Sequence, residues 1–191
     1  DVQATFNAVI TNPPFGKLDD TVMYDSFPIN TLDHLMALKA LDCMASDGKA
    51  AIIIGGHTTW DERGRIQAGR NRIFFNYLYS RYNVMDVIQI DGHKLFSRQG
   101  TSFNVRLILI NGRKLSVSGN APVYNAATDV VVRSFDDLFD RITGAMDSKI
   151  EKLVMKKDLT NLEKEAVMLQ SLFEDKNLGQ TQDDDTVDHD K

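Results

Sequence analysis

Four consecutive residues near the start of the chain, Asn12, Pro13, Pro14 and Phe15, carry groups that could bind an amine on a planar ring. The two prolines fix φ and remove two backbone donors, so the segment is stiff and presents carbonyl oxygens. The Asn12 side-chain oxygen and the Pro13 carbonyl could accept hydrogen bonds from one exocyclic amine, while Phe15 offers a flat face to a base. This stretch, here called the proline corner, is predicted to hold an amine from two sides.

The element that positions the proline corner is the apolar run directly before it. Phe6–Thr11 is short, rich in apolar residues and ended by the prolines, which is typical of a strand buried on both faces. In an open α/β sheet, ligands bind beyond the carboxyl ends of the strands. A central position for this strand therefore predicts that the proline corner lies at a ligand-binding edge.

The following segments alternate in the rhythm of an α/β fold. The predicted elements are a helix over 31–44, a strand over 49–56, a helix over 71–82, and strands over 84–90 and 103–110. The aromatic residues of 71–82 also suit a strand. The first strand, helix and second strand make a parallel crossover unit. Only about a dozen residues without helical periodicity separate the last two strands, which favours an antiparallel pair. We expect an α/β sheet of parallel strands whose last strand is reversed.

The carboxyl-terminal third is less regular. We expect a β segment within 123–132, a helix over 134–146 with Phe135, Leu138, Phe139 and Ile142 on one face, and another helix that begins at a capping box of Thr160 and Glu163. Residues 174–191 hold seven acids and two lysines, a balance equal to the formal net charge of −5 of the whole chain. This end is predicted to be a solvated, disordered tail.

Composition bounds the class of protein. The chain has 191 residues, of which 42% are hydrophobic and 26% charged, enough for one sizeable core. Cys43 is the only cysteine, so disulfides and thiolate metal sites are excluded and a reduced, cytoplasmic compartment is expected. No apolar run approaches the roughly 20 residues that cross a bilayer. The start is neither a signal peptide nor an initiator Met, and we expect a chain cut from something longer.

The proline corner resembles the (Asp/Asn/Ser)-Pro-Pro-(Tyr/Phe/Trp) signature of S-adenosylmethionine-dependent amino-methyltransferases. With Gly16, it is most similar to the adenine-specific DNA methyltransferases of restriction-modification systems. The segments "GKAAIIIGG", "RNRIFFNYLYSRYNVMDVIQI" and "HKLFSRQGTSFNVRLILI" follow in the order seen in type I modification subunits and related gamma-like enzymes. The resemblance spans about residues 6–112 and implies part of a Rossmann-like methyltransferase sheet.

The resemblance implies a role for each residue of the corner. Asn12 and the Pro13 carbonyl would accept from the amine of a target adenine beside the methyl end of S-adenosylmethionine, on the rigid turn that Pro14 completes. Phe15 would stack on the base after it is flipped from the duplex, and Phe96 matches the family's second aromatic contact with that base. The reaction is a direct methyl transfer that calls for no metal and no catalytic cysteine.

One part of the family pattern is missing. These enzymes bind the cofactor through a glycine-rich turn and an acidic residue upstream of the corner, whereas only eleven residues without glycine precede Asn12. We expect the adenosine site to lie outside this chain, in an amino-terminal half or on a partner such as a specificity subunit, and the chain alone to be inactive. The expected organisation is a catalytic half over 1–112, a β/helical extension over 113–173 and the tail over 174–191.

Several basic residues are candidates for binding DNA phosphates. They are Lys17, Arg63, Arg65, Arg70, Lys94 and Arg98. Asp61 and Glu62 adjoin the arginine cluster, so an ordinary surface of mixed charge is the competing interpretation, and Arg72 is expected to anchor its helix. The four histidines lack ligand spacing, and Asp33 with His34 is interpreted as helix capping.

Three functions stay open at this stage. The first is the adenine-specific DNA methyltransferase. The second is a methyltransferase that acts on a glutamine side chain or on guanine in ribosomal RNA, because both use Asn-Pro-Pro-aromatic corners. The third is a non-catalytic DNA-binding or anti-restriction module that kept the corner and lost the cofactor half.

Overall fold

The computed structural model describes residues 4–56, 58–97, 103–147, 160 and 164. The chain divides into two compact units, Asp1–Ala145 and Met146–Lys191, and every labelled helix and strand belongs to the first unit. Residues 160 and 164 are helical. The rest of the helix predicted from Thr160, including Glu163, and the acidic tail lie outside the described residues.

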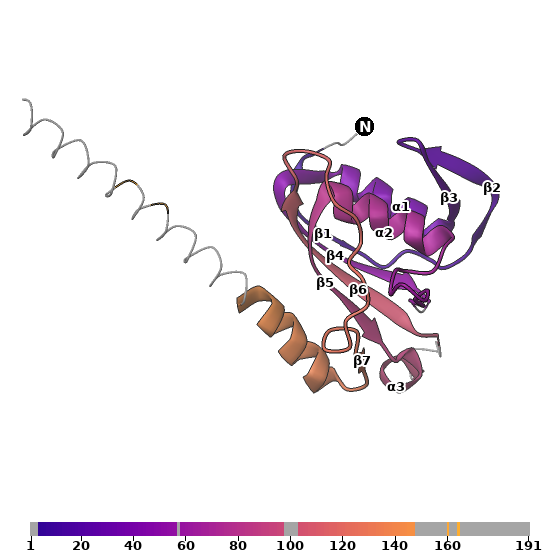
Figure 1. The fold of residues 1–191 in the computed structure, drawn as a ribbon, viewed down its shortest axis with the longest axis vertical. Helices are drawn as coiled ribbons and strands as arrows, with labels where there is room; N and C mark the ends of the chain where they lie inside the picture. Colours follow the sequence, from indigo (N-terminus) through magenta and orange to yellow (C-terminus); the bar gives the residue numbers. More distant parts are fainter. Residues whose placement is uncertain (1–3, 57, 98–102, 148–159, 161–163, 165–191) are drawn as a thin grey trace, which may run out of the picture. The chain divides into compact units, whose positions relative to one another are not determined.

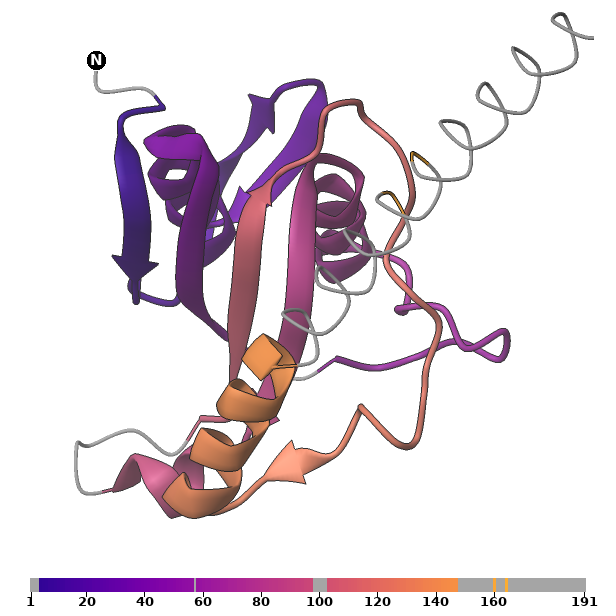
Figure 2. The same cartoon turned by 90° about the vertical axis from the view of Figure 1, so that its left-hand side faces the viewer.

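Five strands form one mixed sheet in the order β1-β4-β6-β5-β7 (Figures 1 and 2). The strands are β1 (Phe6–Thr11), β4 (Met44–Gly55), β5 (Tyr82–Ile90), β6 (Val105–Arg113) and β7 (Val131–Val132). β1 pairs with β4 in parallel, as β5 does with β7, whereas β6 runs antiparallel to both β4 and β5. β1, β4, β5 and β7 therefore point the same way, and β6 is reversed between them.

The main elements expected from the sequence are confirmed with shifted ends. The helices are α1 (Leu32–Asp42) and α2 (Arg70–Arg81), and the first two expected strands pair in parallel around α1. The last two expected strands are antiparallel neighbours, with one short helix, α3 (Gly92–Leu95), between them. Of the β segment expected within 123–132, only the two residues of β7 form a strand.

The expectation that Phe6–Thr11 is a central strand buried on both faces is wrong. β1 lies at the edge of the sheet and pairs only with β4. Its side chains are largely open to solvent: Ile10 is 86% exposed and Phe6 51%. An apolar run indicates which side chains could be buried. Whether they are buried depends on whether other segments of the chain pack against them.

A β-hairpin that the sequence analysis did not predict separates β1 from α1. β2 (Lys17–Tyr24) and β3 (Phe27–Thr31) form a two-stranded antiparallel sheet. Asp25 and Ser26 join the two strands with φ of 47° and 69°. Two consecutive left-handed residues are typical of a type I′ turn, whose twist suits a hairpin.

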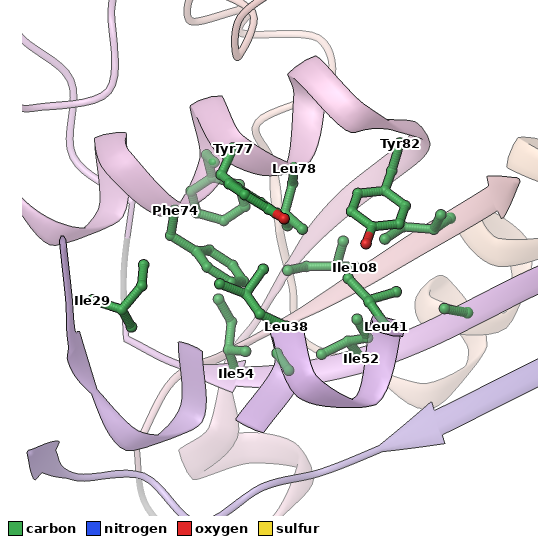
Figure 3. Close-up of a cluster of buried hydrophobic side chains, with 14 of the residues drawn as sticks. Ile29, Leu38, Leu41, Ile52, Ile54, Phe74, Tyr77, Leu78, Tyr82 and Ile108 are labelled. Carbon is green, nitrogen blue, oxygen red and sulfur yellow. The ribbon is translucent and has the colours of Figure 1, made fainter. Parts of the chain in front are cut away.

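The largest core cluster lies between the sheet and the helices α1 and α2 (Figure 3). Leu38 and Leu41 of α1 and Phe74 and Leu78 of α2 are fully buried there. The sheet supplies Ile52, Ile54 and Ile108. Since the strands deliver alternate side chains to this face, the two helices are fixed against the sheet by ordinary apolar burial.

A second apolar cluster contains Ile88, Ile90, Leu95, Val105, Leu107 and Val132. The helix expected over 134–146 is helical from residue 135, and the Ser134 hydroxyl accepts a 3.1 Å hydrogen bond from the Asp137 N–H at its start. Leu138 and Ile142 pack on the cluster as expected, whereas Phe135 and Phe139 are 58% and 70% exposed. Within the described part of the chain, no helix is long and apolar enough to cross a membrane.

Candidate functional site

The proline corner follows β1 directly and lies beside the carboxyl end of β4. The two strands are parallel, with Thr11 paired to Ile52, so their carboxyl ends meet at one edge of the sheet. There the ring of Phe15 lies against Gly55: a Cβ added to Gly55 would be 3.1 Å from Phe15 Cγ. A side chain at this position would push the ring away by a few tenths of an ångström, so the glycine backbone is the surface on which Phe15 rests, here called the floor under Phe15.

The corner presents its groups unequally. Asn12 is exposed, Pro13 is buried and Phe15 is 40% exposed. Among the described residues, no hydrogen bond engages the Asn12 side-chain oxygen or the Pro13 carbonyl. Both acceptors needed for an amine are therefore unused within the part of the chain that the structure describes.

A cavity of about 780 Å³, here called the corner cavity, lies next to Phe15. It is lined by Phe15, Gly16, Lys17, Thr31, Asp33, His34, Gly55, Gly56, Arg70, Asn71, Phe103, Asn104 and Arg106. Asn12, Pro13 and Pro14 are not among these residues, so Phe15 is the member of the corner that faces the cavity. The cavity gathers residues from five segments far apart in the sequence at the carboxyl ends of β1 and β4, where open α/β sheets bind ligands.

Two charged side chains fix the backbone of Gly55. The Asp33 carboxylate accepts a 3.0 Å hydrogen bond from the Gly55 N–H. Arg106 Nη2 donates to the Gly55 carbonyl at 3.0 Å, and Nη1 donates to the Thr58 hydroxyl at 2.7 Å. Since both polar groups of Gly55 are held by buried ionic side chains, the floor under Phe15 is rigid.

Arg106 carries the main positive charge beneath the cavity. It is 1% exposed, and its guanidinium lies 4.9 Å from the centre of the Phe75 ring. Burial lowers the pKa of Arg106 to about 10, although Asp33 raises it, so the side chain remains cationic at neutral pH. Its Nε–H is buried without a hydrogen-bond partner in the described structure.

His34 stands beside this network as a neutral ring. It is 2% exposed and stacks on Phe74, with ring centres 4.1 Å apart and planes 8° apart. Burial lowers the pKa of His34 to about 4, against the opposing effect of Asp33, and Arg106 and Arg70 lower it further. At neutral pH His34 therefore contributes apolar contact and uncharged ring nitrogens.

The interpretation of Asp33 as a helix cap is wrong. α1 begins after Thr31 without a side-chain capping bond, and the Asp33 carboxylate reaches across to β4 instead. The sequence carried a usable signal, because Asp33 and His34 fall on the same face of α1 as Ala37, Leu38 and Leu41. Arg106 gave a similar signal as a lone charge between Val105 and Leu107 in an apolar strand. Buried charges of this kind require partners.

The two aromatic candidates lie in different places. Phe15 lines the corner cavity, whereas Phe96 packs on the second apolar cluster, with its ring edge-on to Phe135 at 6.3 Å. Phe103, which the sequence analysis did not single out, lines the corner cavity and is 70% exposed. The role of Phe96 as a second contact with a base stays a prediction, and Phe103 has the better position for one.

The basic residues proposed to bind DNA phosphates also lie in different places. Lys17 and Arg70 line the corner cavity, whereas Arg63, Arg65 and Lys94 do not, and Arg98 lies outside the described residues. Asp61 binds Arg65 at 3.0 Å and Arg72 at 2.7 Å, so Arg72 ties the start of α2 to the preceding loop. Partial desolvation raises the pKa of Asp61, but hydrogen bonds from the arginines outweigh it and lower the pKa to about 2.

The described residues contain no group of three or more His, Cys, Asp or Glu side chains that could hold a metal ion. The corner cavity offers an aromatic face from Phe15 and a cationic floor from Arg106, while the acceptors of Asn12 and Pro13 lie outside its lining, in the segment that leads from β1 to Phe15. Comparison of the sequence with protein-family models and with curated proteins finds no match.

Proposed function

We propose that this chain is the target-base half of an S-adenosylmethionine-dependent methyltransferase that acts on the exocyclic amine of adenine in DNA. The observation that carries the proposal is the position of the proline corner. It directly follows β1 at the carboxyl end of a parallel strand pair, with Phe15 on Gly55 at the mouth of the corner cavity. The reversed strand β6 also supports the resemblance to a methyltransferase sheet.

In the proposed reaction, Asn12 and the Pro13 carbonyl accept hydrogen bonds from the two N–H groups of the adenine amine. These bonds draw the nitrogen toward tetrahedral geometry, so that its lone pair attacks the sulfonium methyl. When bound, S-adenosylmethionine would supply the methyl group: the N–CH₃ bond would form as the S–CH₃ bond broke, leaving methyladenine and S-adenosylhomocysteine, and the amine proton would leave to solvent. Phe15 stacks on the base and offsets part of the few kcal/mol that flipping costs.

Asp33 and Arg106 act in this proposal as positioning residues. They hold Gly55, and Gly55 sets the height and tilt of the Phe15 ring. Lys17 and Arg70, at the cavity wall, suit the phosphates on either side of a flipped nucleotide. This cationic lining favours DNA over a glutamine side chain, which carries no phosphate.

The cofactor's adenosine is bound elsewhere in this proposal. The exposed edge of β1, with Ile10 86% and Phe6 51% exposed, supports a further segment that pairs with β1 and covers these side chains. Such a segment would bring the glycine-rich turn and acidic residue that the family uses. A specificity subunit or the amino-terminal half of the same protein is the partner that we propose.

The test expresses the full reading frame that contains this chain and incubates it with labelled S-adenosylmethionine and DNA, RNA or protein. We expect label in adenine of DNA, its loss in Asn12→Ala with folding intact, and no transfer by the 191-residue chain alone. Preferential labelling of RNA or protein would favour the guanine or glutamine methyltransferase. DNA binding without any transfer would favour the non-catalytic module.

A further inference from the structure

A second cavity, of about 650 Å³, lies away from the proline corner, between α2, β5 and the segment 121–129. We call it the Trp60 cavity. Its aromatic walls are Trp60, Phe75, Tyr79 and Tyr124, and the Trp60 and Tyr124 rings meet edge to face with centres 5.0 Å apart. Walls of this kind suit a flat aromatic ligand.

Gln89 is the buried polar group of the Trp60 cavity. It lies on β5, lines the cavity and is 8% exposed. Its side chain makes no hydrogen bond to any described residue. Among the described residues, the buried side-chain atoms without a partner are Thr31 Oγ1 and Arg106 Nε, so the Gln89 amide is not sealed in the protein and opens to the cavity with its donor and its acceptor unused. An amide held at the wall of an aromatic cavity therefore points to a ligand that supplies both.

The charges around the cavity restrict that ligand. Arg141 donates from Nε and Nη2 to the two oxygens of the Asp86 carboxylate, at 2.8 and 2.9 Å, so the Asp86 charge compensates its own. Asp129 also lines the cavity and leaves the balance negative. Burial, with help from Asp86 and Asp129, raises the pKa of Tyr79 to about 12, so its hydroxyl stays protonated. An anionic ligand is therefore disfavoured, which leaves the uncharged aromatic rings among the ligands that these walls can take.

We propose that the Trp60 cavity binds the adenine ring of a neutral nucleoside. Adenine presents an amine donor next to a ring-nitrogen acceptor, which is the complement of a Gln side chain. The Gln89 oxygen accepts from the amine and its nitrogen donates to the ring, while Trp60 and Tyr124 contact the faces and edge of the base. The proposal is independent of methyl transfer, because none of the residues of the proline corner lines this cavity.

Trp60 is the only tryptophan of the chain, so its fluorescence reports directly on this cavity. Adenosine titrated into the full chain is expected to change the Trp60 emission with saturation. Purine riboside, which keeps the ring and sugar but lacks the amine, is expected to bind about tenfold more weakly, as the loss of one hydrogen bond implies. Absence of a saturable change with adenosine would overturn the proposal.

The variant Gln89→Met keeps the volume of the side chain and removes its amide. We expect it to weaken adenosine binding about tenfold and to abolish the preference over purine riboside. Gln67→Met, in the same loop as Trp60 but outside the cavity lining, is the matched control and should bind adenosine normally. Equal binding of adenosine and purine riboside to the unaltered chain would contradict the assignment of Gln89, even if Gln89→Met failed to fold.

Adenine also occurs in single-stranded DNA, so a separate experiment must distinguish a free nucleoside from a nucleic acid as the source of the ring. The negative balance at the cavity leads us to expect that a short oligonucleotide of deoxyadenosines binds more weakly than adenosine. Tighter binding of the oligonucleotide would overturn the assignment to a free nucleoside.

Discussion

The ring of Phe15 rests on the backbone of Gly55, 40 residues further along the chain, so closely that a Cβ on Gly55 would lie 3.1 Å from Phe15 Cγ. Gly55→Ala therefore forces the ring to move by a few tenths of an ångström. We expect methyl transfer by the full-length protein to fall about tenfold, since small misplacements at a reacting centre are costly.

The same substitution should barely change folding, because the backbone of Gly55 does not require a left-handed conformation. Thermal unfolding should shift by no more than about 1 kcal/mol in free energy. Gly144→Ala, in helix 135–147 with open space around it, is the control that should leave transfer intact. Transfer at the normal rate by Gly55→Ala would contradict the role of Gly55 as the floor under Phe15.

Arg106→Ala should destabilise the fold strongly. The change removes the donors to the Gly55 carbonyl and the Thr58 hydroxyl and leaves Asp33 without its compensating charge. We expect the free energy of unfolding, measured with urea, to fall by about 3–5 kcal/mol. Arg133→Ala is the matched control: Arg133 is 63% exposed and 3.8 Å from Asp91, and its loss should cost less than about 1 kcal/mol.

The lowered pKa of His34 leads us to expect that the folded chain loses stability in mild acid. Its pKa is about 4 in the folded chain against an ordinary 6.5, so between these values the unfolded chain binds more protons. Above pH 6.5 the His34 ring is neutral in both states and does not affect the free energy of unfolding. As the pH falls toward 4, protonation of the unfolded chain lowers that free energy, by a total on the order of 3 kcal/mol.

The measurement for His34 is urea unfolding at several pH values across that window. His34→Phe keeps the stacking on Phe74 and removes the titrating group, so it should flatten the dependence. His93→Asn, at an exposed position, should keep it. An unchanged pH profile in His34→Phe would assign the acid sensitivity to other groups.

Phe96 and Phe103 can be separated by paired truncation. Phe96→Ala removes a half-buried ring from the second apolar cluster and should lower the free energy of unfolding by about 1–3 kcal/mol. Phe103→Ala removes an exposed ring at the corner cavity, so transfer should fall while stability changes little. Loss of transfer in Phe96→Ala at unchanged stability would instead favour Phe96 as the second contact with the base.

The two unpredicted parts of the fold have different causes. Asp25 and Ser26 were a local signal for a hairpin, since two turn-forming residues stand between apolar stretches, yet neither is a glycine that would have marked a type I′ turn. The edge position of β1 had no local signal at all. Its sequence is as apolar as that of a central strand, and only the strand order shows that β4 is its single neighbour.

The sequence by itself determined the alternation of strands and helices and the stiff corner that follows the first strand. Apolar periodicity and the fixed φ of Pro13 and Pro14 act over a few residues, so they can be read locally. Tertiary structure alone decided that Asp33 and Arg106 hold Gly55, and that Phe103 rather than Phe96 faces the corner cavity. These relationships join residues tens of positions apart, and they exist only once the sheet brings distant strand ends to one edge.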